Sequence, residues 1–227
     1  MGELNIGLFI LYMIALVFSL SAHEAAHAWM SNRFGDDLAR SLGRVTLNPA
    51  SHVDLIGTLL FPALAFFTNA PLLGWARPTP INPANWSNYR VANFFVSIAG
   101  ILANVLIAIS AGIALRVLLE TGMIAFSGGW FVPVATDSAV VRGAVELLVV
   151  LFILNVTLAV FNLLPIPPLD GSKILSSLLP EQFGRALAAL DQIGFILLFV
   201  AVFTGVFSVV FRFVMPIAWS LLLLGYN

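Results

Sequence analysis

Long runs of apolar residues, separated by short polar stretches, dominate the pattern along this chain. A helix needs about 20 predominantly apolar residues to cross the roughly 30 Å hydrocarbon core of a membrane. Four stretches reach that length, and they are residues 4–30, 91–119, 139–164 and 192–211. The pattern therefore predicts four membrane-spanning helices.

Two further apolar stretches are too short to span a membrane. Residues 53–67 contain Asp54 and Pro62, which favour a re-entrant segment that enters the membrane and returns on the same side. Residues 213–224 are similarly short and are interpreted as one half of a hairpin. No polar segment is long enough for an appended soluble domain, so we expect residues 1–227 to form a single integral-membrane domain.

The composition agrees with a membrane protein and narrows its chemistry. Hydrophobic residues make up 60% of the chain and charged residues 9%, whereas soluble domains carry roughly 25% charged residues. The net charge is −1, so no basic surface indicates a nucleic-acid partner. The chain has no cysteine, which excludes Cys-based metal sites and leaves three histidines and eleven carboxylates as candidate ligands. We expect an all-α polytopic membrane protein with about four to six transmembrane helices.

The basic residues predict the orientation of the helices, because cytoplasmic flanks are enriched in Lys and Arg. The first span has no basic residue before it and three soon after it, which places its C-terminal end in the cytoplasm. If residues 53–67 turn back, the cytoplasmic side holds seven of the ten basic residues, namely Arg33, Arg40, Arg44, Arg77, Arg90, Lys173 and Arg185. We expect a multi-pass protein of a prokaryotic plasma membrane.

The motif His23-Glu24-Ala25-Ala26-His27 lies at the cytoplasmic end of the first predicted span. Helical i, i+4 spacing places both imidazoles on one face, where they can share a zinc ion. The glutamate of this H-E-x-x-H arrangement acts as general base for a water molecule whose pKa the zinc lowers. Ionisable residues in a lipid-embedded helix are costly and usually mark function, so we predict a catalytic metal site here.

A catalytic zinc site typically has three protein ligands and one open position, so a third ligand must come from elsewhere. The candidates are His52, Asp54, Glu146 and Asp170. Asp170 belongs to the motif F-N-L-L-P-I-P-P-L-D-G, whose three prolines end a helix and fix an extended turn. If residues 53–67 turn back, we expect this turn to bring Asp170 to the two histidines. If that stretch crossed fully, Asp170 would emerge on the opposite side.

Together, H-E-x-x-H and the downstream N-x-x-P-x-P-P-L-D-G motif resemble the site-2 protease family of intramembrane zinc metalloproteases, in a compact form without PDZ or CBS domains. The segment Gly100–Asn104 is similar to the G-x-x-x-N segment of that family, although Ile101 stands where a proline is often found. Residues 74–78 and 82–83 also resemble the cytoplasmic loop of compact members.

The resemblance implies one Zn²⁺ per chain with His23, His27 and Asp170 as metal ligands and Glu24 as general base. It also makes Asn162 the first candidate for stabilising the oxyanion through its side-chain amide. It implies hydrolysis of a peptide bond in or near a transmembrane helix of a membrane-protein substrate, either in regulated intramembrane proteolysis or in the clearance of membrane remnants. Asn104 is a further candidate for the role of Asn162.

Residues 43–48 alternate in a strand-like way, and we hypothesise that this small membrane-associated β element pairs with unwound substrate. His52 is expected to have a structural or substrate-contacting role. Two alternatives stay open. One is a gluzincin-type membrane protease whose third ligand is Glu146, and the other is a membrane metal transporter that uses the same His and carboxylate groups.

Overall fold

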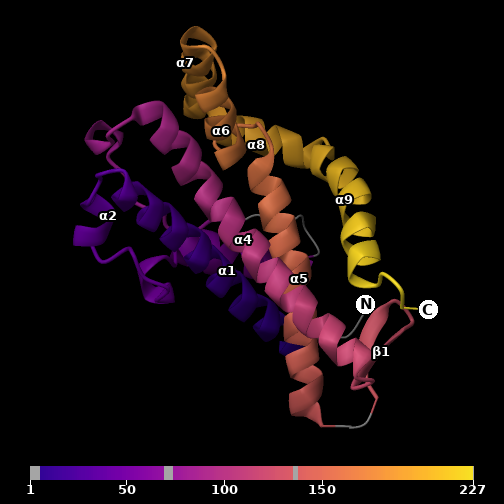
Figure 1. The fold of residues 1–227 in the computed structure, drawn as a ribbon. Helices are drawn as coiled ribbons and strands as arrows, with labels where there is room; N and C mark the ends of the chain where they lie inside the picture. Colours follow the sequence, from indigo (N-terminus) through magenta and orange to yellow (C-terminus); the bar gives the residue numbers. More distant parts are fainter. Residues whose placement is uncertain (1–5, 69–73, 135–137, 227) are drawn as a thin grey trace.

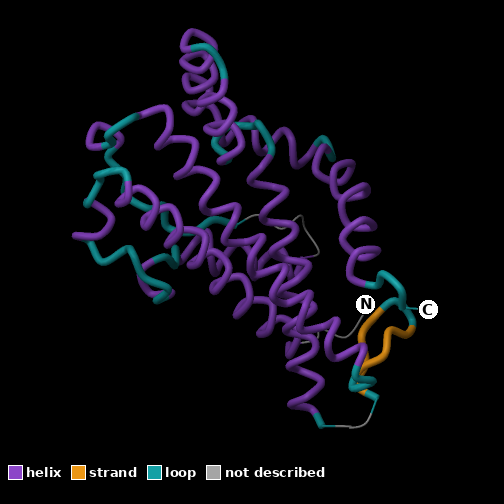
Figure 2. The backbone as a smooth tube through the Cα atoms, viewed as in Figure 1, coloured by secondary structure: helices purple, strands orange, loops and turns teal. Residues whose placement is uncertain are grey.

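The computed structural model describes residues 6–68, 74–134 and 138–226, and these segments are mostly helical (Figures 1 and 2). Three helices, α1 (Ile6–Arg33), α4 (Tyr89–Glu120) and α5 (Ala139–Leu163), are long and apolar enough to cross a membrane. They pack against one another as the centre of the molecule. Three of the four predicted spans are thus confirmed, and residues 4–5 of the first lie outside the described segments.

Local chemistry explains where the long helices begin and end. α4 begins after Asn88, whose side-chain oxygen accepts a hydrogen bond of 3.2 Å from the Val91 N–H, and this satisfies a donor that has no partner inside the helix. α5 ends at Leu163 because Pro165 restricts the residue before it and lacks an N–H. Small buried residues of α4, such as Ala108 and Ala111, let the helices approach closely, as membrane helices require.

The fourth predicted span, residues 192–211, is wrong in its bounds. The segment divides into α8 (Gly194–Phe203) and α9 (Val206–Leu222), and the two helical stretches are bent by 66° at the break. Gly205 lies at the break with a φ of +78°, a left-handed conformation that glycine adopts without a steric cost. Residues 213–222 consequently continue α9, and they are not one half of a separate hairpin.

The predicted re-entrant segment folds into two short helices, the π-helix η2 (Leu55–Leu60) and α3 (Phe61–Thr68). The chain then returns beside its own starting point, since the Trp75 N–H donates to Gly57 O at 3.1 Å and the Arg77 N–H donates to His52 O at 2.8 Å. These bonds agree with a segment that turns back on the side from which it came.

The strands β1 (Ile124–Ser127) and β2 (Trp130–Pro133) form an antiparallel hairpin between α4 and α5, at the opposite end of the molecule from α7 (Figure 1). The predicted β element at residues 43–48 is therefore in the wrong place. That stretch forms no strand, and in the described part of the chain no second strand pairs with it. Instead, Thr46 O contacts His52 Nε2 at 2.8 Å.

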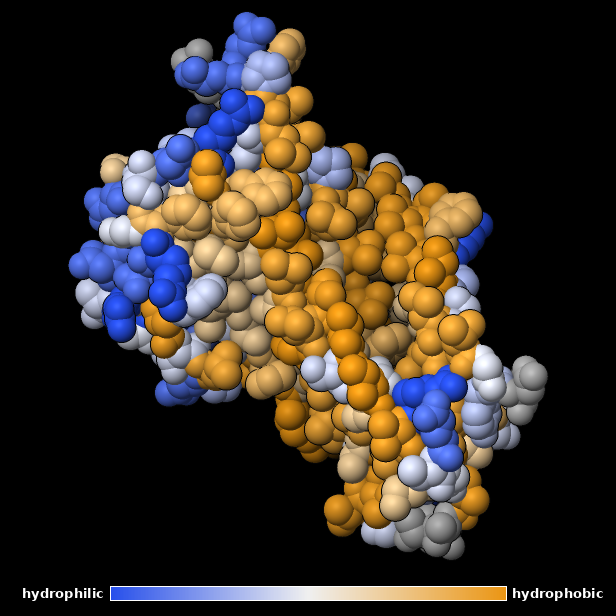
Figure 3. Space-filling model, viewed as in Figure 1, coloured by the Kyte–Doolittle hydropathy of each residue, from blue (hydrophilic) through white to orange (hydrophobic). Residues whose placement is uncertain are grey.

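Short elements gather at the end of the molecule where α1 finishes and α4 begins. They are α2 (Leu38–Ser41), η1 (Pro49–Ser51), η3 (Pro83–Asn85), α6 (Asp170–Leu178), α7 (Glu181–Ala189) and η4 (Leu190–Ile193). Hydrophilic residues cluster over α2 and α7, whereas a broad hydrophobic surface covers the long helices (Figure 3). This separation is the one expected of a protein embedded in lipid.

Candidate metal centre

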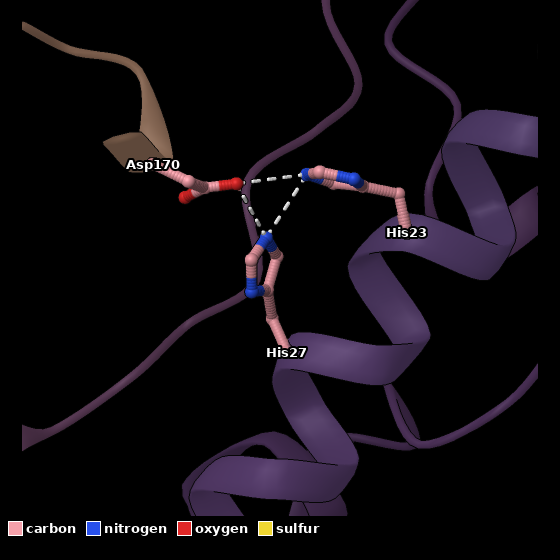
Figure 4. Close-up of side chains that lie close together, drawn as sticks. All are labelled: His23, His27 and Asp170. Atoms are coloured by element: carbon pink, nitrogen blue, oxygen red, sulfur yellow. Dashed lines mark hydrogen bonds and ion pairs between the residues drawn. The ribbon is translucent and has the colours of Figure 1, made fainter. Parts of the chain in front are cut away.

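His23 and His27 of α1 meet Asp170, the first residue of α6, although 143 positions separate His27 from Asp170 in the chain (Figure 4). The two Nε2 atoms lie 3.0 Å apart. Asp170 Oδ2 lies 3.1 Å from His23 Nε2 and 3.2 Å from His27 Nε2. All three side chains are buried, so their ligand atoms surround one point that is shielded from solvent.

Hydrogen bonds on the far side of each ring determine which nitrogen faces that point. His27 Nδ1 lies 2.7 Å from Val96 O, which can only accept, so this nitrogen carries the proton. His23 Nδ1 lies 2.7 Å from the Asn104 side-chain oxygen, which also can only accept, so His23 Nδ1 carries a proton as well. Both Nε2 lone pairs therefore point at each other and at a carboxylate oxygen. Such an arrangement is stable when a cation lies between them, and a two-His, one-carboxylate set suits zinc.

Burial alone would raise the pKa of Asp170, but a positive charge on His27 and hydrogen bonds donated by both imidazoles would hold it well below its usual range. A cation bound between neutral imidazoles would favour the ionised carboxylate in the same way. The second carboxylate oxygen, Oδ1, lies 3.5 Å from Lys173 Nζ. Gly171 is required for the close approach of α6 to the end of α5, since a Cβ there would overlap the Leu163 carbonyl.

A buried polar network that the sequence analysis missed orients His23. The Asn104 amide donates to Asn155 Oδ1 at 2.9 Å, and the Asn155 amide donates to Ser19 Oγ at 2.8 Å. All three residues of this network are fully buried. Asn104 was considered as an oxyanion stabiliser, but its oxygen contacts a histidine instead. Asn155 is a polar residue within the apolar span α5, and this position could have indicated its functional importance from the sequence.

Glu24 lies between the two histidines in the chain, and its carboxylate is partly exposed. Its Oε2 accepts a hydrogen bond of 2.8 Å from the Thr79 N–H, and its backbone oxygen accepts one of 3.0 Å from the Thr79 hydroxyl. Glu24 also lines a cavity of about 1070 Å³ that reaches His23, His27 and Asp170. The carboxylate is thus held beside the metal-binding group and open to the cavity.

Asn162 lines the same cavity, but its amide donates to Leu158 O in its own helix at 3.0 Å. Its role as an oxyanion stabiliser therefore stays a prediction. His52 is fully buried and bonds to Thr46, in agreement with a structural role. Asp54 accepts hydrogen bonds from the first N–H groups of η2, which makes it a helix cap.

Glu146 does not approach the metal-binding group. It lies seventeen residues before the end of α5, which is roughly 25 Å along the helix axis. Within residues 6–68, 74–134 and 138–226, one group of three His, Asp or Glu side chains could hold a metal ion, and it consists of His23, His27 and Asp170. The gluzincin alternative consequently has no support from the geometry.

Comparison with known proteins places the chain beside zinc metalloproteases. Residues 11–203 match the sequence model described as Peptidase family M50. The protein named "Putative zinc metalloprotease YwhC" from Bacillus subtilis (strain 168) is 35% identical over 188 residues, which cover 83% of this chain and 78% of that protein. "Putative zinc metalloprotease Rip2" from Mycolicibacterium smegmatis is 30% identical over 195 residues, or 86% of this chain and 67% of the relative. No solved structure shows a significant match to the chain.

Proposed function

The chain belongs to peptidase family M50, the site-2 protease family of membrane zinc metalloendopeptidases, and from this premise we propose that it hydrolyses a peptide bond in or near a transmembrane helix of a membrane-protein substrate. This cleavage would serve either regulated intramembrane proteolysis or the clearance of membrane remnants. Residues 1–227 act in this proposal as one domain, because ligands come from both halves of the chain.

The observation that carries the proposal is the cavity that joins the metal-binding group to the apolar interior between helices. Its volume of about 1070 Å³ exceeds the roughly 300–1,000 Å³ of small-molecule pockets. Much of its lining consists of aliphatic and aromatic residues of α1, α5, α8 and α9, among them Tyr12, Leu16, Leu20, Ile153, Leu154, Leu158, Leu198, Phe199, Phe207 and Phe211. Walls of this kind suit an apolar polypeptide better than a soluble peptide.

We propose His23, His27 and Asp170 as the residues that hold the zinc ion. Bound zinc supplies a Lewis acid that lowers the pKa of water and polarises a carbonyl group. Glu24 takes the proton from the attacking water and later delivers it to the leaving amine. Val96 O and the Asn104 side chain keep the imidazoles in the required tautomer, and Thr79 keeps the base in position.

The proposed partners are a transmembrane-helix substrate and the surrounding lipid. The basic loops near α2, α4 and α6 support an orientation with the metal-binding group toward the cytoplasm. A prokaryotic plasma membrane is the proposed location, and the bacterial relatives are compatible with it.

A helical substrate must unwind before water reaches its peptide bonds, and its freed backbone then needs partners. Residues 74–81, which we call the strap, run past Glu24 and line the cavity in part. Alternate N–H groups of the strap, those of Trp75, Arg77 and Thr79, donate to other parts of the protein. In an extended chain the intervening residue Ala76 directs its N–H to the opposite side.

We infer that unwound substrate pairs with the strap at Ala76, in place of the hypothesised edge at residues 43–48. Ala76 lines the cavity, and its N–H has no hydrogen-bond partner in the described part of the chain. Ala76→Pro removes this donor, and we expect it to lose cleavage of a transmembrane test substrate while keeping zinc. Ala76→Ser retains the N–H at the same position and is the matched control. Equal cleavage rates for the two variants would contradict this pairing.

The metal ligands and the base can be tested with purified Glu24→Gln and Asp170→Asn, by measuring bound zinc and cleavage of a transmembrane test substrate. The proposal predicts zinc without cleavage in the first variant and weakened zinc in the second. Glu146→Gln is the control for the gluzincin alternative and should keep both properties. Retained cleavage in Glu24→Gln would defeat the mechanism in which Glu24 is the general base, whereas zinc binding without cleavage by the unaltered protein would leave room for the transporter alternative.

A further inference from the structure

Arg44 is a buried cation near the proposed catalytic base, and it is 8% exposed. It forms no ion pair with any residue of segments 6–68, 74–134 or 138–226. Its Nη2 donates to Pro78 O at 3.0 Å, and its Nη1 is buried without a hydrogen-bond partner in the same segments. A buried charge with so few partners is costly, so its position calls for an explanation beyond packing.

The peptide group that Arg44 contacts is the one that contacts Glu24. Its carbonyl oxygen belongs to Pro78 and accepts from the guanidinium, and its N–H belongs to Thr79 and donates to Glu24 Oε2 at 2.8 Å. The dipole of this peptide group thus points its positive end at the carboxylate and its negative end at the cation. Each of the two hydrogen bonds polarises the peptide group and thereby strengthens the other hydrogen bond. Both involve a charged group, and such bonds are stronger than those between neutral groups.

The electrostatic surroundings of Arg44 are consistent with this arrangement. Burial and the neighbouring charge of Arg77 lower the pKa of the Arg44 guanidinium, while the Glu24 carboxylate acts in the opposite direction. Glu24 is therefore close enough for its charge to be felt at Arg44 across the peptide group.

Other contacts hold the strap in place independently of Arg44. The buried Asp36 carboxylate accepts hydrogen bonds from the Asn82 N–H at 2.9 Å and from the Asn85 amide at 3.4 Å. The Arg77 N–H also donates to His52 O. Loss of Arg44 should thus leave the strap attached and affect mainly the orientation of the Pro78–Thr79 peptide group.

We propose that Arg44 is a positioning residue for the catalytic base, which fixes the Pro78–Thr79 peptide group so that the Thr79 N–H holds the Glu24 carboxylate toward the cavity. This inference rests on the proposed role of Glu24 as general base. Thr79 is the intermediate through which Arg44 acts, and Arg44 itself touches neither the metal ligands nor, in this proposal, the substrate.

The test uses the full-length protein in detergent with the transmembrane test substrate, and it compares kcat, KM and bound zinc. Arg44→Met should lower kcat by roughly 10- to 100-fold, the scale of a displacement of about 1 Å in a catalytic group, with KM and zinc content unchanged. Arg44→Lys retains a cationic donor and should recover part of the lost kcat. Arg40→Met is the matched control, because Arg40 is exposed and its Nη1 donates only to Asn32 Oδ1.

A double-mutant cycle distinguishes the proposed route from a general effect on structure. Thr79→Pro removes the N–H that contacts Glu24, so adding Arg44→Met to it should lower kcat little further. Independent, multiplicative effects would overturn the inference, as would an unchanged kcat in Arg44→Met. Loss of zinc or of the folded state in both Arg44→Met and Arg44→Lys would also overturn it and make Arg44 a structural residue. Cleavage by Glu24→Gln would instead refute the proposed role of Glu24, and absence of cleavage by the unaltered protein would refute the proposed function itself.

Discussion

Gly100 offers a sharp test of the metal centre, because it is the residue of α4 that faces both imidazoles. A Cβ added at this position would lie 2.5 Å from His27 Nε2 and 2.7 Å from His23 Cε1. Optimal contacts between such atoms are about 3.5 Å or longer. Gly100→Ala therefore requires the rings or the helix to move by roughly 1 Å.

A movement of that size matters far more to the metal than to the fold. Ligand distances in a metal site are fixed to about 0.2 Å, and disturbing the groups that orient ligands costs roughly 10- to 100-fold in metal affinity. Because Gly100→Ala displaces the ligands themselves, we expect a loss at or beyond the upper end of that range. Alanine should at the same time favour the helix by roughly 0.5–1 kcal/mol, which offsets part of the roughly 1–3 kcal/mol cost of overpacking, so zinc affinity should fall by more than the stability of the apo protein.

The assay is zinc affinity measured by competition with a chelator, together with thermal unfolding of the apo protein and cleavage of the test substrate. Gly112→Ala is the matched control in the same helix. Its Cβ would meet two ring carbons of Phe152 at 3.3 and 3.4 Å, and the three atoms nearest to it include none of the proposed metal ligands. We expect Gly112→Ala to retain zinc. If Gly100→Ala binds zinc as tightly as the unaltered chain, the inferred geometry of the centre is wrong.

Three further predictions concern the surroundings of the centre. Asn104→Leu removes the acceptor at His23 Nδ1 and should weaken zinc binding by about 10- to 100-fold in the same chelator competition. Lys173→Met removes a cation 3.5 Å from Asp170 Oδ1, and since that side chain is 45% exposed zinc affinity should change by no more than a few-fold. Burial would raise the pKa of Asp36, but the N–H and hydroxyl groups around it lower it below 3.8. The ionised Asp36 carboxylate therefore stabilises the fold fully at a pH above its pKa in the unfolded chain. This stabilisation is lost as the pH falls through the lower pKa that Asp36 has in the folded protein. Asp36→Asn should flatten the acid limb of a stability curve recorded by denaturant unfolding, and an unchanged limb would contradict this account.

The features that could be predicted from the sequence are those that depend on neighbouring residues. Hydropathy over twenty residues identifies α1, α4 and α5, because a spanning helix satisfies its own backbone. The pairing of His23 with His27 follows from helical geometry alone. Their meeting with Asp170 could be predicted because the charge pattern and the proline-rich turn restrict where that carboxylate emerges.

The features that could not be predicted depend on contacts between distant segments or on a single backbone conformation. The break at Gly205 lies within a continuous apolar run, so hydropathy does not reveal it. The strand-like alternation of residues 43–48 requires a partner strand, and among the described residues β1 and β2 pair with each other instead. The contact between Thr79 and Glu24 could not be predicted because it depends on the strap lying beside α1 in the folded protein.

The contacts that orient the metal ligands also hold the spanning helices in register. Apolar side chains give membrane helices little reason to prefer one another over lipid, so small residues and buried hydrogen bonds determine how they associate. Here Ser19 of α1, Asn104 of α4 and Asn155 of α5 form one buried chain of hydrogen bonds that ends at His23. A slip of any one helix would leave amide groups unpaired in an apolar interior and would at the same time turn a zinc ligand. We therefore expect the association of the three spans and the formation of the proposed metal centre to depend on the same hydrogen bonds.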